Sequence, residues 1–134
     1  MPWKNGGGIT TQIALSQNQP LFHWRASRAQ VASSGPFSCF TGYDRILFLL
    51  QGDEGIILNF KDRTVILDKQ LSMVKFMGEE PCQADISKPI TDWNWMTLRS
   101  EGVGDANVIS QAGDQMEATV IYAVDSSKVS QIGN

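Results

Sequence analysis

Histidine and cysteine are scarce in this chain. His23 is the one histidine among 134 residues, whereas a metal centre built on imidazoles needs several of them together with a carboxylate. The two cysteines, Cys39 and Cys82, lack metal-ligand spacing, so we expect free thiols, with Cys39 buried and inert. A Gly-x-Ser-x-Gly nucleophile elbow is also missing, which removes support for hydrolase chemistry of that type. The sequence therefore predicts neither a metal nor another cofactor.

Long apolar runs and clusters of basic residues are missing as well. The longest uninterrupted apolar run, residues 46–50, is too short to cross a bilayer, and the N-terminus has no apolar signal-peptide core. The net charge is -3, the pI is about 5.0, and lysines and arginines are scattered. A nucleic-acid partner needs a basic face. We therefore expect a cytoplasmic protein that binds neither nucleic acid nor membranes.

The chain does contain many short segments with the pattern of β-strands. With 42% hydrophobic and 19% charged residues, the length suits one domain over residues 1–134, with a polar, frayed tail over 125–134. No segment keeps a 3.6-residue apolar period, so we predict an all-β fold, either a sandwich or a barrel. The predicted strands cover residues 9–15, 21–31, 45–50, 56–60, 64–67, 71–76, 82–86, 93–98, 106–110 and 116–124.

The predicted strand 21–31 has two different faces. Trp24 and Ala26 alternate with Arg25 and Ser27, so the two pairs point to opposite sides of a sheet. In an open sandwich the Arg25 side is solvated surface, whereas in a closed barrel it lines the lumen. If Trp24 packs outward against a second layer, the Arg25 guanidinium offers bidentate recognition of a carboxylate inside the barrel.

A second alternating pattern, at residues 92–97, separates polar from aromatic side chains. Asp92 and Asn94 fall on one face, and Trp93 and Trp95 fall on the other. One interpretation places the polar pair in a hydrogen-bonding pocket. The other leaves that pair exposed while the tryptophans cover the barrel. The Trp93/Trp95 face is also a candidate interface for a protein partner.

The loop 35–45 contains Phe40 and ends with Tyr43, Asp44 and Arg45 at the start of the most apolar strand. Loops that carry ionic groups to the edge of a buried strand commonly form small-molecule sites. Asp44 and Arg45 are adjacent, so on a strand they point to opposite faces. One of them is expected to line a pocket while the other anchors the loop, and a structural ion pair is the simpler alternative. The sequence leaves open which one faces inward.

The N-terminal segment adds three more candidates. Trp3, Lys4 and Asn5 precede consecutive glycines at residues 6–8, whose backbone can approach an anionic ligand closely. The Gly-Lys-Ser/Thr ending of a P-loop is absent. A flexible terminus is the simpler interpretation, but Trp3 is a costly residue to leave without a packing role.

Together these motifs resemble the HutD/Ves family. The resemblance covers residues 2 to about 99 and rests on the order and spacing of Pro-Trp-Lys-Asn-Gly-Gly-Gly at 2–8, Trp-Arg-Ala-Ser at 24–27 with Val31, Gly-Pro-Phe-Ser at 35–38 with Phe40, Gly-Tyr-Asp-Arg at 42–45, and Asp-x-Asn-x-Met-Thr at 92–97. It implies a cupin-like β-barrel, typically a double one, in a cytoplasmic bacterial protein. In the HutD branch it implies a link to histidine utilisation, and no catalytic activity is established for the family.

The resemblance also implies a ligand, a small carboxylate such as urocanate or formylglutamate, bound without metal; a homodimer is also considered. Carried over by motif, the pocket is expected to draw on Lys4, Asn5, Arg25, Ser27, Tyr43, Asp44, Arg45, Asp92 and Asn94. Arg25 or Arg45 is expected to hold the carboxylate. Asn5 and Asn94 are expected to supply amide hydrogen bonds. Phe40 or Trp3 is expected to form an apolar wall.

The chain departs from the family pattern in three places. It begins directly at the Pro-Trp-Lys motif, it has Leu-Arg-Ser at 98–100 where the family has Arg-Arg-Gly, and its C-terminal part is short. We therefore expect an abbreviated second half and a divergent branch.

Three classes of function are weighed. A metal-free protein that binds a small anionic metabolite and regulates a pathway is the first. An isomerase or lyase with Asp44 or Tyr43 as acid or base is the second, and a partner-binding module that uses Trp93 and Trp95 is the third. The lack of metal ligands and of a nucleophile–base pair favours the first.

Overall fold

The computed structural model describes residues 1–3, 6–15, 22–101, 120–123 and 128–131, and their regular structure is almost entirely β. A short 3₁₀ turn, η1 (Arg99–Glu101), follows β9, and no helix in these ranges is long and apolar enough to cross a membrane. The prediction of an all-β fold is confirmed. The strands are β1 (Gly8–Leu15), β2 (Trp24–Val31), β3 (Gly35–Pro36), β4 (Tyr43–Gln51), β5 (Ile56–Phe60), β6 (Thr64–Leu67), β7 (Met73–Met77), β8 (Cys82–Asp85), β9 (Ile90–Leu98), β10 (Val120–Ala123) and β11 (Lys128–Gln131).

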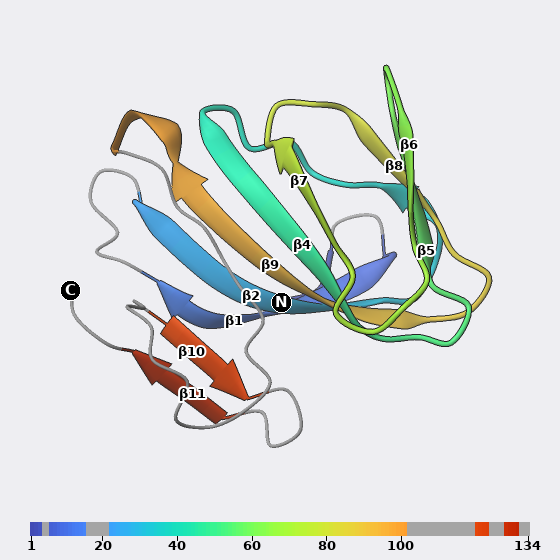
Figure 1. Cartoon of the computed structure of the whole chain (residues 1–134), viewed down its shortest axis with the longest axis horizontal. Helices are drawn as coiled ribbons and strands as arrows, with labels where there is room; N and C mark the ends of the chain where they lie inside the picture. The colour runs from blue at the N-terminus through green and yellow to red at the C-terminus, as the bar shows by residue number, and fades with distance from the viewer. Residues whose placement is uncertain (4–5, 16–21, 102–119, 124–127, 132–134) are drawn as a thin grey trace.

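Two antiparallel sheets enclose a common core. The larger sheet has the order β1-β2-β9-β4-β7, and the smaller has the order β3-β8-β5-β6. Figure 1 shows the larger sheet as a curved layer, with β5, β6 and β8 standing beyond β7. Leu47 and Leu49 of β4 belong to the same buried cluster as Leu58 of β5 and Ala84 of β8. One face of the larger sheet therefore lines an interior that the smaller sheet closes, as in a barrel.

Strand β4 is apolar on both faces because it is buried on both. Leu47 and Leu49 point to the interior cluster, whereas Ile46 and Phe48 belong to a second buried cluster, on the outer face, that also contains Trp95. The strand lies between β9 and β7, so both of its edges are hydrogen-bonded. The prediction that the run at 46–50 is an internal strand is confirmed.

Most predicted strands agree with the structure, and the differences have local causes. The strand predicted from residue 71 begins at Met73, because Leu71 has a φ of 68° and interrupts the extended backbone. The two-residue strand Gly35–Pro36 was missed because both residues favour turns. It forms an edge of the smaller sheet, where proline is tolerated.

The prediction of a frayed tail over 125–134 is wrong for Lys128–Gln131, since this strand pairs with Val120–Ala123. The strand predicted at 106–110 lies outside the described residues, as do residues 116–119 and 124 of the strand predicted at 116–124.

Candidate functional site

Arg25 and Arg45 lie on the same face of the larger sheet. Both are in register with Met96, Arg25 from β2 and Arg45 from β4, on either side of β9. Directly opposite residues of antiparallel strands share a face, and two strand spacings separate the two arginine backbones by about 10 Å. This face is the interior one, because Arg45 alternates in phase with Leu47 and Leu49 of the interior cluster. Both arginines, and not only one of them, therefore lie on the barrel's interior side.

The guanidinium of Arg45 is almost fully enclosed, with only 6% of the residue exposed. Its Nη1 donates to the carbonyl oxygen of Ser38 at 3.1 Å, and its Nη2 donates to Oδ1 of Asn94 at 3.0 Å. The rings of Phe40 and Phe76 lie 5.3 and 4.9 Å from the guanidinium carbon and supply cation–π attraction. Burial lowers the pKa of Arg45 to about 10, so the side chain is still a cation at neutral pH.

A chain of hydrogen bonds runs from Arg45 through Asn94 to Asp92. Asn94 accepts from Arg45 at Oδ1 and donates through Nδ2 to Oδ1 of Asp92 at 2.9 Å. Asp92 is only 1% exposed. Burial raises the pKa of Asp92 to about 7, although the charge of Arg45 and the hydrogen bond from Asn94 both act to lower it. Ser27, also buried, lies opposite Asn94 on β2. We call Arg25, Ser27, Arg45, Asp92 and Asn94 the arginine cluster.

Three buried polar atoms of the arginine cluster have no hydrogen-bond partner in the part of the chain that the structure describes. They are Nε of Arg25, Nε of Arg45 and Oδ2 of Asp92. Desolvation lowers the pKa of the half-buried Arg25. The positive charge of Arg25 in turn acts to lower the pKa of Arg45. A buried polar group without a partner costs about 1–3 kcal/mol. Two N–H donors and one carboxyl oxygen are therefore left for a bound group.

Asp44 does not join the arginine cluster. It lies on the other side of β4 from Arg45, and its carboxylate accepts a hydrogen bond from Nε of Arg99 at 2.9 Å. Arg99 also pairs with Glu79 at 2.9 Å and donates to the carbonyl oxygen of Tyr43. The hydrogen bond from Arg99 lowers the pKa of Glu79 to about 2. The structure thus favours the structural ion pair over a pocket role for Asp44.

Tyr43 makes a structural contact with the residues that precede β2. Its hydroxyl donates to the carbonyl oxygen of Phe22 at 2.8 Å, and the two rings stack with centroids 4.5 Å apart. Burial raises the pKa of Tyr43, so the phenol stays protonated at neutral pH. These contacts fix the start of β4, and with it the position of Arg45 two residues later.

Replacing Tyr43 with phenylalanine tests this structural assignment. Tyr43→Phe keeps the stacked ring but leaves the carbonyl oxygen of Phe22 without its donor. We expect the free energy of unfolding to fall by about 1 kcal/mol, measured by urea denaturation, with carboxylate affinity unchanged. A loss of affinity without a loss of stability would instead assign the hydroxyl to the binding site.

The remaining predicted residues divide into three cases. Phe40 lies beside the arginine cluster as one of the two rings next to Arg45. Trp3 packs edge-on against Phe37 at 5.9 Å and donates from Nε1 to the Thr10 hydroxyl at 2.7 Å, which is the packing role that its presence at the terminus suggested. Lys4 and Asn5 lie outside the described residues, so their roles stay predictions.

Both cysteines are free thiols, as expected. Cys82 is buried, and burial raises its pKa to about 11. Cys39 is exposed, so the expectation of a buried thiol was wrong there. Within the described residues no group of three or more His, Cys, Asp or Glu side chains is placed to hold a metal ion.

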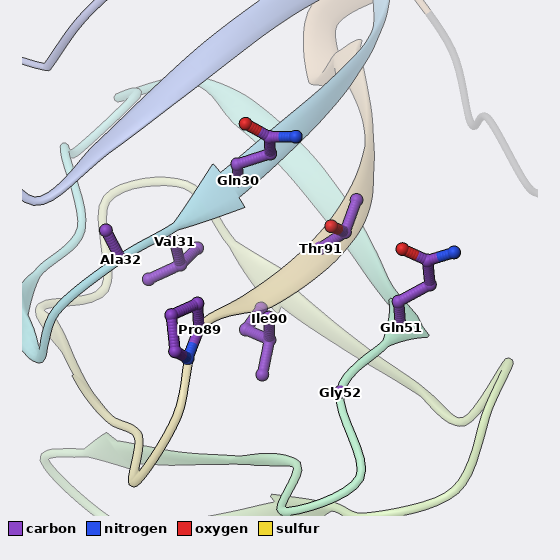
Figure 2. A pocket seen from close by; sticks show the side chains of 8 residues that line it. All are labelled: Gln30, Val31, Ala32, Gln51, Gly52, Pro89, Ile90 and Thr91. Atoms are coloured by element: carbon purple, nitrogen blue, oxygen red, sulfur yellow. The ribbon is translucent and has the colours of Figure 1, made fainter.

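Two surface hollows lie at the end of the larger sheet that is farther from Arg25 and Arg45. The first, of about 260 Å³, is lined by Gln30, Val31, Ala32, Gln51, Gly52, Pro89, Ile90 and Thr91, and Figure 2 shows its polar side chains coming from β2, β4 and β9. The second, of about 500 Å³, shares Gln51 and Gly52 with the first and also contains Asp53 and Asp68. Neither lining includes a lysine or arginine, and the acidic pair repels anions. The candidate site for an anion is therefore the arginine cluster.

Comparison with known proteins places these features in a family. The HutD family model matches residues 1–131. Protein Ves of Escherichia fergusonii is 38% identical over 98 residues, which are 71% of this chain and 51% of that protein. An uncharacterized 21.2 kDa protein in the hutC 3' region of Pseudomonas putida is 53% identical over 55 residues, 40% of this chain and 29% of that protein.

Two solved structures support membership of the HutD family and the cupin-like fold. HutD from Pseudomonas fluorescens SBW25, in a formate condition, matches with a TM-score of 0.66 at 36% identity, over 72% of this chain and 54% of that one. A cupin superfamily protein from Desulfitobacterium hafniense DCB-2 matches with a TM-score of 0.53 at 15% identity, over 68% and 76% of the two chains, which confirms the cupin-like fold alone. The chain spans about half the length of its Ves and HutD relatives. With the family model matched over residues 1–131, the chain belongs to the HutD family.

Proposed function

We propose that this chain binds a small carboxylate metabolite at the arginine cluster, without a metal ion, and that it regulates histidine utilisation or a related pathway. The observation that carries the proposal is that the buried Nε–H groups of Arg25 and Arg45, on one interior face, have no partner among the residues that the structure describes. A carboxylate offers two acceptor oxygens and forms strong, charge-assisted hydrogen bonds with guanidinium groups. We infer that one small anion between the two arginines accepts hydrogen bonds from both donors.

The charge balance of the arginine cluster supports an anionic ligand. Arg25 and Arg45 are both cations, and the one acidic residue of the cluster is Asp92, which interacts with Arg45 and has a pKa of about 7. The cluster therefore carries excess positive charge in a chain whose net charge is -3. Away from water this excess attracts an anion more strongly than the same charges on a solvated surface.

Family membership supports the ligand class. The HutD structure from Pseudomonas fluorescens is of a formate condition, and formate is the smallest carboxylate. The Pseudomonas putida relative is a protein in the hutC 3' region. The family resemblance links HutD proteins to histidine utilisation, so urocanate and formylglutamate are the first metabolites to test.

The two alternative functions gain no support from the described residues. Asp44 pairs with Arg99, and the Tyr43 hydroxyl donates to a backbone carbonyl, so neither is presented as a free acid or base. Trp93 and Trp95 are only 8% and 9% exposed, which leaves little of the tryptophan face for a protein partner.

Isothermal titration calorimetry with sodium formate, urocanate and formylglutamate tests the proposal directly. Formamide is the matched neutral control for formate, because it has nearly the same shape but no charge. We expect heat of binding with at least one carboxylate and none with formamide. Equal binding of formate and formamide would remove the charge-based argument, and no binding of any of the carboxylates would overturn the proposed function.

Arg25→Gln is the variant that best separates binding from folding, because Arg25 is only half-buried. Removing one charge-assisted contact costs about 1.5–3 kcal/mol, so we expect carboxylate affinity to fall by about tenfold to a hundredfold, measured by calorimetry. The matched control is Arg28→Gln, on the same strand but on the opposite face, where Arg28 lies opposite Trp93. A similar loss in both variants would show only a general effect of net charge.

A further inference from the structure

The ionisation of Asp92 and the binding of the proposed ligand both depend on the positive charge of Arg45. Asp92 is buried, and among the described residues the hydrogen bonds that link it to the Arg45 guanidinium run through the amide of Asn94. Among the described residues, Arg45 is the one charge that acts to keep Asp92 ionised. A carboxylate that pairs with Arg45 therefore competes with Asp92 for that charge.

We propose that carboxylate binding at the arginine cluster is coupled to protonation of Asp92, so that each bound anion brings a proton into the site. This inference rests on the proposed function and adds a regulation to it. Binding of the anion compensates the Arg45 charge and places a second negative charge near Asp92, and two carboxylates that share one site do not both stay ionised.

The unpartnered oxygen of Asp92 is the atom that takes up the proton in this proposal. In the free protein, Oδ1 of Asp92 accepts from Asn94, whereas Oδ2 is buried and has no partner among the described residues. An ionised carboxylate only accepts hydrogen bonds, but a protonated one also has an O–H donor. Protonation at Oδ2 thus turns an unsatisfied acceptor into a donor for an oxygen of the bound carboxylate.

Among the described residues, the other charged and titratable groups around Asp92 are not alternative acceptors for this proton. Strand β2 contributes Arg25 and β4 contributes Arg45, and both remain cations at neutral pH. Cys82 on the smaller sheet and Cys39 on the 35–45 loop both act to raise the pKa of Arg45. Burial raises the pKa of Cys82 itself, so this thiol stays protonated at neutral pH. The neighbours on β9 and β2, Asn94 and Ser27, do not titrate.

The direction of the effect follows from linkage. In the free protein the pKa of Asp92 is about 7, and the bound anion raises it. Between the free and the bound pKa the complex holds more protons than the free protein, so affinity falls as pH rises. Above about pH 7 the loss approaches tenfold per pH unit when one proton is taken up. Formate itself stays ionised throughout, because carboxylic acids in water titrate near pH 4.

The experiment is calorimetric titration of sodium formate into the wild-type protein from pH 6 to pH 8.5. At pH 7.5 it is repeated in triethanolamine and in Tris, two cationic amine buffers whose ionisation enthalpies differ, so that the difference in heat reports the protons taken up. We expect uptake of up to about one proton per formate and a steady loss of affinity above pH 7. In Asp92→Asn we expect an affinity independent of pH and, at pH 8.5, tighter than in the wild type.

Two control variants make the test specific. His23→Gln removes the only histidine, which is exposed, and Asp53→Asn removes an exposed turn carboxylate; both are expected to keep the wild-type pH profile. Formate binding with no proton uptake and a flat pH profile would overturn the coupling and leave the proposed function standing. If formate does not bind, the same titrations are run with urocanate and formylglutamate, and no binding of any of the three at any pH would overturn both. The buffer comparison needs only the wild-type protein, so the test does not depend on the folding of a variant.

Discussion

Replacing Arg45 with methionine is expected to abolish carboxylate binding and to destabilise the protein strongly. The substitution leaves the carbonyl oxygen of Ser38 and Oδ1 of Asn94 without their donors, and it leaves Asp92 buried without a cation. Breaking a buried charge pair by removing one partner costs about 3–5 kcal/mol. We expect a loss of this size in the free energy of unfolding at pH 8, measured by urea denaturation.

The loss is expected to depend on pH and on Asp92. Because Asp92 is protonated at low pH, Arg45→Met costs less at pH 5 than at pH 8. Adding Asp92→Asn to Arg45→Met is expected to recover part of the stability at pH 8, and the double-mutant cycle measures the coupling between the two residues.

Arg63 provides a matched control for Arg45, because its guanidinium also lies over a phenylalanine ring, 4.1 Å from the centroid of Phe60, but it pairs with Glu80 nearer the surface. Arg63→Met is expected to cost much less than Arg45→Met at pH 8. Equal losses in the two variants would contradict a special role for the buried guanidinium.

The sequence predicted the strands of this site better than their faces. Asp44 is in phase with Ile46 and Phe48, and Arg45 is in phase with Leu47 and Leu49. Both sets are apolar because β4 is buried on both sides, so hydrophobic alternation carried no signal about which charged residue faces the interior. Which face of β4 is the interior one depends on the smaller sheet, because that sheet closes the interior. The smaller sheet pairs segments that lie far apart in the chain.

The register between paired strands was the other property that the sequence did not predict. Arg25 and Arg45 meet across Met96 through pairings between β2 and β9 and between β9 and β4. Phe76, which lies opposite Arg45 on β7, was missed for the same reason. The alternation of Arg25 with Trp24 was predicted correctly, and Trp24 stacks on Trp95 with ring centroids 5.5 Å apart. The choice between a solvated and an interior Arg25 needed the closed barrel.

Asp92→Asn is expected to stabilise the free protein, and the gain should grow with pH. The folded-state pKa of Asp92 is about 7, whereas an aspartate in an unfolded chain titrates at about 3.9. Between these values the folded state binds more protons, so Asp92 lowers the free energy of unfolding as pH rises from about 4 to about 7, and by a constant amount above that. At about 1.4 kcal/mol per pKa unit, the full effect is on the order of 4 kcal/mol.

The measurement is the difference in unfolding free energy between Asp92→Asn and the wild type at pH 5, 6, 7 and 8, from urea denaturation without ligand. The comparison is needed because Glu79 and Glu80 act in the opposite direction: hydrogen bonds from arginines lower the pKa of each, and the stability that they contribute is lost as pH falls. These groups are unchanged in the variant, so their contributions cancel in the difference. Asp53→Asn, on an exposed turn, is expected to show no such trend. A difference that stays constant from pH 5 to pH 8 would mean that Asp92 titrates alike in the folded and unfolded chain, and the buried carboxyl group would then not be the proton site of this protein.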